Sequence, residues 1–180
     1  MIDHFSVDRN RIYAAGYSAG GESIEPERIM TRAMLAVTLH RAVGSPAVTN
    51  GAIFSDVPQD VYYTDAVTWA SANGIMTEYG DGYFGSSDPV SRAQIAVILW
   101  RCAGFPEAEA GQNFVDESSI PAYASVAVDW ARANGVMNGM SGNRFDPRGS
   151  VTRAQVAKIL RSYLTMTPVT MRTIQTQAAI

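Results

Sequence analysis

The chain contains one pattern of residues twice, at an offset of 61 positions, and this repetition constrains its fold more than any other feature. The two copies occupy residues 54–104 and 114–165. Identical residues at equivalent positions are Trp69 and Trp130, Asn73-Gly74 and Asn134-Gly135, Phe84 and Phe145, Arg92 and Arg153, and Leu99 and Leu160. Such regular agreement indicates a single supersecondary unit that is used repeatedly and that buries its apolar face against its neighbours.

An incomplete third copy precedes these two. Thr31-Arg32-Ala33 matches Ser91-Arg92-Ala93 at an offset of 60 positions, but nothing before Ile24 resembles the first half of the unit. We therefore expect an N-terminal segment of uncertain fold at 1–23, a truncated repeat 1 at 24–44, repeat 2 at 54–104, repeat 3 at 114–165 and a tail at 166–180.

Each complete repeat predicts a helix, a loop and a second helix. Small and apolar residues recur at helical spacing over 65–72 and 126–133, and a glycine follows each segment where a left-handed stop belongs. The second helix starts at Ser91 or Thr152 with a glutamine three residues later, which is the pattern of a capping box. The expected fold class is mainly α.

Composition excludes several classes of function. The net charge of -3 and the pI near 5.3 argue against a broad basic surface for nucleic acid. No segment approaches the roughly 18 consecutive apolar residues of a membrane-spanning helix. Cys102 is the single cysteine, so neither an internal disulfide nor a multi-cysteine zinc site can form, and no metal or other cofactor is expected.

Four segments of the repeats resemble those of S-layer homology repeats. These are the Phe-Ser-Asp-Val start at 54–57, the helix with Trp and Asn-Gly, the Gly-rich loop with Phe, and the Thr/Ser-Arg-Ala start of the second helix. The resemblance covers 24 to about 165. It implies three repeats in a pseudo-threefold arrangement, and non-covalent attachment of an exported protein to a bacterial cell wall, commonly through a pyruvylated secondary cell-wall polymer bound in grooves between repeats.

In that family the arginine of the Thr-Arg-Ala-Glu signature contacts the acidic sugar, which implies ligand-binding roles for Arg32, Arg92 and Arg153. Here the fourth signature position is Met34, Gln94 or Gln155 instead of glutamate. Each arginine stands at the first position of a helix, where the helix dipole disfavours a cation by roughly 0.3–1 kcal/mol. An anion held by the arginine and the free N–H groups would explain this choice. The alternative is that each arginine pairs with a nearby acidic residue and only braces the loop.

Two further groups of residues are candidates for contact with a glycan. Trp69 and Trp130 could stack on sugar faces or pack in the core between helices. The loops could let their backbone approach a ligand or could simply form turns; their candidate residues are Tyr79, Gly80, Asp81, Met140, Ser141 and Gly142. Phe84 and Phe145 are expected in the core, and Asp56 and Asp116 are expected to fix the start of each repeat.

A different motif lies near the N-terminus. Residues 16–20 read Gly-Tyr-Ser-Ala-Gly and resemble the nucleophile elbow of α/β-hydrolase esterases, with Ser18 as a vestigial nucleophile. Such a serine requires an acid and a later histidine, and the only later histidine is His40, within the second helix of repeat 1. We therefore expect no enzyme activity.

The expected location is extracellular, at the cell wall or cell surface. The first 16 residues lack the apolar core of a signal peptide, which suggests a piece of a longer exported protein. The expected partner is a secondary cell-wall polymer or another peptidoglycan-linked glycan. Self-association that completes the truncated repeat, or a purely structural helical module, is the alternative.

Overall fold

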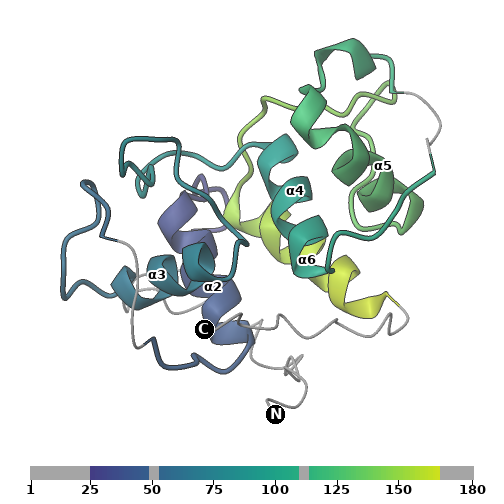
Figure 1. The fold of residues 1–180 in the computed structure, drawn as a ribbon. Coiled ribbons are helices and arrows are strands. Elements are labelled where there is room, and N and C mark those ends of the chain that lie inside the picture. Colours follow the sequence, from purple (N-terminus) through teal and green to yellow (C-terminus); the bar gives the residue numbers. More distant parts are fainter. Residues whose placement is uncertain (1–24, 49–52, 110–113, 167–180) are drawn as a thin grey trace. The chain divides into compact units, whose positions relative to one another are not determined.

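A computed structural model describes residues 25–48, 53–109 and 114–166 of the chain (Figure 1). Within these residues the regular structure consists of helices joined by loops, which confirms the predicted mainly-α class. The α-helices are α2 (Arg32–Ala42), α3 (Thr64–Ala72), α4 (Arg92–Cys102), α5 (Ser125–Ala133) and α6 (Arg153–Thr165), with short 3-10 turns at Glu117–Ser119 and Ala122–Ala124. None of these helices is both long and apolar enough to cross a membrane.

The described residues form two compact units whose boundaries differ from those of the sequence repeats. Unit 1 contains residues 31–88, in which α2 packs against α3. Unit 2 contains residues 25–30 and 89–166, in which α4 packs against α5. Each unit therefore joins the second helix of one repeat to the first helix and loop of the next.

The helix ends follow the sequence signals. The hydroxyl groups of Ser91 and Thr152 accept hydrogen bonds from backbone N–H groups three residues later, and the glutamine side chains there accept from the cap residues in return. This confirms both capping boxes. The glycines after α3 and α5, Gly74 and Gly135, each have φ +65°, the left-handed conformation that ends a helix at low cost for a residue without Cβ.

A closed ring of three backbone hydrogen bonds lies in unit 2 and joins all three repeats. The Met30 amide donates to the Val151 carbonyl (2.9 Å), the Val151 amide to the Val90 carbonyl (3.0 Å), and the Val90 amide to the Met30 carbonyl (2.9 Å). All three side chains are buried. Each residue stands two positions before a signature arginine, so the ring joins equivalent positions of the three repeats within unit 2.

Asp56 and Asp116 fix the start of each complete repeat to its own loop, as predicted. The Asp56 carboxylate accepts from the amides of Phe84 (2.7 Å) and Ser86 (2.6 Å). Asp116 accepts from the amides of Phe145 and Asp146, each at 2.8 Å. Burial alone would raise the pKa of both carboxyl groups, but these amide hydrogen bonds stabilise the charged form and lower it.

Phe84 and Phe145 are fully buried, which confirms their expected place in the core. Each ring lies against the phenylalanine that starts its own repeat, with ring centroids 5.3 Å apart for Phe54 and Phe84 and 5.2 Å apart for Phe114 and Phe145. The aromatic pair and the aspartate brace close the loop of each repeat in the same way.

We predict that Asp56→Asn lowers the melting temperature at pH 7, because the amide side chain can accept at only one atom and loses about 1–2 kcal/mol of hydrogen bonding. The folded-state pKa of Asp56 lies below its ordinary 3.8, so its contribution is complete above that value and is lost as the pH falls through the folded pKa. Thermal unfolding at pH 7 and pH 3 should show the difference shrinking in acid. Asp60→Asn, at an exposed position, is the control; equal melting of all three proteins at pH 7 would refute the brace.

Candidate functional site

The helix N-termini at the signature arginines already have backbone partners. In unit 1 the amides of Arg32 and Ala33 donate to carbonyls in the loop of repeat 2, at 3.0 Å each. In unit 2 the amides of Arg92 and Ala93 donate to carbonyls in the loop of repeat 3, at 2.9 and 3.0 Å. The third amide of each helix donates to the cap hydroxyl. The free N–H groups on which the anion-site interpretation depended are therefore not free in α2 or α4.

The Arg32 and Arg92 side chains are buried, with 4% and 8% of their surface exposed. Arg32 donates from Nε to the Phe84 carbonyl (2.9 Å) and from Nη2 to the Thr77 carbonyl (2.6 Å). Arg92 donates from Nε to the Phe145 carbonyl and from Nη2 to the Asn138 carbonyl (3.0 Å). Both arginines thus brace the loop of the following repeat, although through backbone carbonyls and not through the carboxylates that the sequence suggested.

Aromatic rings also contact the guanidinium groups of these two arginines. The Arg32 guanidinium lies 4.4 Å from the Tyr79 ring centroid and 4.6 Å from that of Phe84, and the Arg92 guanidinium lies 5.0 Å from that of Phe145. Burial lowers the pKa of both guanidinium groups, since it removes a cation from water. The carbonyl dipoles and the faces of the aromatic rings offset the lost hydration of each cation.

Arg153 occupies the equivalent position in α6. Its amide donates to the Arg28 carbonyl (2.9 Å), and the Ala154 amide donates to the Pro26 carbonyl (2.9 Å). The Arg153 side chain is half-buried, unlike those of Arg32 and Arg92. Residues 25–28 therefore hold the start of α6 as the loops of repeats 2 and 3 hold α2 and α4.

Trp69 and Trp130 are buried, at 6% and 3% exposure, which favours core packing over sugar stacking. The Trp69 ring lies 5.3 Å from the His40 ring of α2, and the Trp130 ring lies 6.2 Å from the Tyr163 ring of α6. Neither tryptophan presents a face to a ligand in this conformation.

The candidate residues of the two Gly-rich loops are exposed. Tyr79 and Met140 are 51% and 47% exposed, and the other four, Gly80, Asp81, Ser141 and Gly142, are exposed as well. Both loops turn in the same manner, because the amide of Tyr79 donates to the carbonyl of Tyr83 and that of Met140 to the carbonyl of Arg144.

This turn brings Tyr83 and Arg144, which the sequence alone did not single out, to the surface beside the predicted residues. The Tyr79 and Tyr83 rings lie 6.3 Å apart, and Tyr83 is 42% exposed. Their position on either side of Gly-Asp-Gly is the signal that could have found Tyr83, since such residues favour a turn that brings its flanking residues together.

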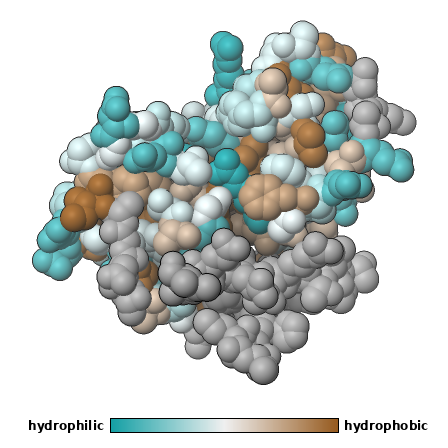
Figure 2. All heavy atoms as spheres, viewed as in Figure 1, coloured by the Kyte–Doolittle hydropathy of each residue, from teal (hydrophilic) through white to brown (hydrophobic). Residues whose placement is uncertain are grey.

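Ser18, the rest of 1–23 and the tail at 167–180 lie outside the residues that the structure describes, and so does the esterase-like motif. On the face drawn in Figure 2, hydrophobic residues form small groups among hydrophilic ones.

Comparison with known proteins places the repeats in a family. The family model described as S-layer homology domain matches residues 53–96 and 113–157. The chain is 31% identical over 171 residues, 90% of its length, to an amylopullulanase of Thermoanaerobacterium thermosulfurigenes, and 30% identical over 171 residues to exoglucanase XynX of Acetivibrio thermocellus. It is 30% identical over 132 residues, 73% of its length, to an S-layer protein of Bacillus licheniformis. It spans only 9%, 16% and 14% of these three proteins, respectively.

We predict that Arg92→Ala destabilises unit 2 by about 3 kcal/mol, because two charged hydrogen bonds are lost and two loop carbonyls lose their donor. The free energy of unfolding of Arg92→Lys should lie between those of the wild type and Arg92→Ala, because an ammonium group lacks the two-pronged geometry of a guanidinium. Denaturant unfolding measures both. Arg161→Ala, at an exposed position of α6, should change stability by less than about 0.5 kcal/mol. Equal stability of the Arg92 and Arg161 variants would show that the brace contributes nothing.

Proposed function

Because this chain carries repeats of the S-layer homology family, we propose that it is a non-catalytic module that holds an exported protein to the bacterial cell wall. The observation that carries the proposal is the pattern of relatives. The matched segment is a small part of proteins with very different names, among them an S-layer protein, an amylopullulanase and an exoglucanase. A segment shared by such proteins supplies something other than one catalytic reaction, and attachment to a common surface fits that role.

The proposed ligand is an acidic secondary cell-wall polysaccharide, with a pyruvyl ketal as its expected acidic group. The exposed loop residues around Tyr79 and Asp81, and around Met140 and Ser141, would contact it. Arg32 and Arg92 would serve the site by holding those loops in shape, whereas Arg153, with its half-buried side chain, would also contact the ligand. On the face drawn in Figure 2, hydrophilic residues surround small hydrophobic groups, which suits a polar, hydroxyl-rich partner.

Co-sedimentation of the purified chain with sacculi of the organism that encodes it tests this proposal. We expect binding to intact sacculi and its disappearance after acid extraction of the secondary polymer, because the polymer carries the recognised groups. Sedimentation of the chain alone measures self-association. Failure to bind intact sacculi, or undiminished binding after extraction, would refute the proposed anchor.

We also predict that the chain does not hydrolyse simple esters through Ser18. The wild type and Ser18→Ala should show the same rate with a chromogenic acetate ester, because the one histidine after Ser18, His40, lies within the second helix of repeat 1. A rate of ester hydrolysis that is lower for Ser18→Ala than for the wild type would support the esterase hypothesis.

A further inference from the structure

The two complete repeats carry very different charges in the segments that precede their second helices. Residues 54–91 contain no lysine or arginine and six acidic residues: Asp56, Asp60, Asp65, Glu78, Asp81 and Asp88. Residues 114–152 contain four acidic residues and three arginines: Arg132, Arg144 and Arg148. These arginines stand where repeat 2 has Ser71, Tyr83 and Ser87, at the offset of 61. An anionic ligand would therefore meet different surfaces on two loops with the same backbone pattern.

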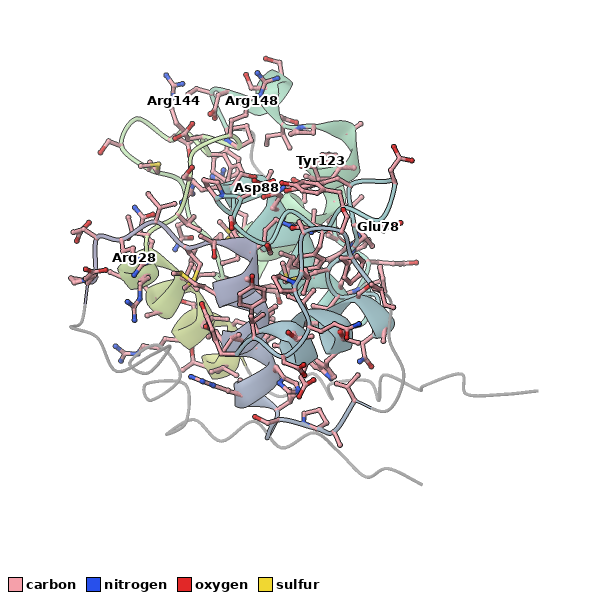
Figure 3. The ribbon with its side chains drawn as sticks, turned by 90° about the vertical axis from the view of Figure 1, so that its left-hand side faces the viewer. Arg28, Glu78, Asp88, Tyr123, Arg144 and Arg148 are labelled. Carbon is pink, nitrogen blue, oxygen red and sulfur yellow. The ribbon has the colours of Figure 1, made fainter. Side chains whose placement is uncertain are left out.

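Arg132 and Arg144 lie at the exposed loop of repeat 3, and Arg148 follows four residues after Arg144. Arg132, on α5, donates from Nη2 to the Asn143 side chain (3.4 Å), and Arg144 is the next residue of that loop. The Arg132 guanidinium lies 4.2 Å from the Phe114 ring centroid, which holds it beside the loop. Figure 3 shows Arg144 and Arg148 projecting outward from the stretch between α5 and α6.

Arg144 and Arg148 are accessible to a ligand, whereas Arg132 is partly enclosed. The Nη1 atom of Arg132 is buried and has no hydrogen-bond partner among the described residues. The side chains of Arg144 and Arg148 are exposed. Both oxygens of the neighbouring Asp116 carboxylate accept hydrogen bonds from backbone amides, so Asp116 interacts with Arg144 only by a longer-range attraction.

The loop of repeat 2 offers nothing comparable. The cations of unit 1 within the described residues are Arg32, which is buried and donates to two carbonyls, and Arg41, which lies in α2. Glu78 and Asp81 are exposed in this loop. Glu78 precedes Tyr79, and Asp81 lies between Tyr79 and Tyr83. Coulomb repulsion from these carboxylates would disfavour an anion there.

We propose that the anionic group of the cell-wall glycan binds at the loop of repeat 3, through Arg132, Arg144 and Arg148, and not at the loop of repeat 2. This inference rests on the proposed function and assigns its charged contact to one repeat. The Tyr79–Tyr83 pair of repeat 2 is left to contact uncharged parts of the sugar chain. A carboxylate or a phosphate would satisfy the same arginines by charge-assisted hydrogen bonds.

The test compares two double variants with the same change in net charge. R144Y/R148S replaces the exposed arginines with the residues that repeat 2 has at these positions, and K158S/R161S removes two exposed cations from α6. Co-sedimentation with intact sacculi is measured at low and moderate salt, after circular dichroism has shown that both variants are folded. We expect R144Y/R148S to bind at least about tenfold more weakly with a shallower salt dependence, because one or more charge-assisted hydrogen bonds are lost. K158S/R161S should bind within about twofold of the wild type.

The outcomes separate the two proposals. Wild-type protein that does not bind sacculi refutes the anchor itself. Wild-type binding with an unchanged R144Y/R148S variant refutes the assignment to repeat 3 and leaves the anchor standing. Equal losses in both double variants would show a general charge effect and would also overturn the assignment. Sacculi treated with mild acid to remove ketal-linked pyruvate distinguish the source of the anion, since loss of binding there identifies the carboxylate and retained binding identifies another anion such as phosphate.

Discussion

The ring of hydrogen bonds between Met30, Val90 and Val151 is the constraint on which the packing of unit 2 depends. Two of the bonds join residues about 60 positions apart and the third, from Met30 to Val151, joins residues about 120 positions apart, and all three residues are buried. If one member were removed, a buried amide and a buried carbonyl would lose their partners, at a cost of about 1–3 kcal/mol each. The ring explains why the truncated repeat keeps residues 25–42, since that segment supplies the third member and the loop that receives α6.

Arg32 and Arg92 fix the loops of the complete repeats in a second way. In unit 1 and in unit 2, a helix begins against the loop of the following repeat, and its arginine reaches two carbonyls of that loop. The cation thus offsets its unfavourable place on the helix dipole by hydrogen bonds to carbonyl groups whose partial charge is negative. The shape of each exposed loop is consequently determined by a residue from another repeat.

Much of this fold could be predicted from the 61-residue offset. Helix limits, capping boxes, the buried Phe84 and Phe145 and the role of Asp56 depend on local patterns or on partners within one repeat, which the sequence displays directly. The acceptors of Arg32 could not be predicted, because they are backbone carbonyls 45 and 52 residues away, and carbonyls carry no sequence signature. The tryptophans stayed ambiguous because an aromatic residue in a short helix suits a core and a sugar platform equally well. The unequal charge of the two loops is visible in the sequence, but the contact of Arg132 with Asn143, the residue before Arg144, is visible only in the structure.

The offset between compact units and sequence repeats also affects how such a chain can grow. One boundary between the units falls between residues 88 and 89, in the short connection from the loop of repeat 2 to its own second helix, α4. A gene duplication of one repeat length therefore adds one helix pair with its braced loop, wherever within the repeat the duplication begins. Recombination breakpoints need not coincide with structural boundaries, and a family built in this way can lengthen, shorten or change its starting residue while its helix pairs remain intact.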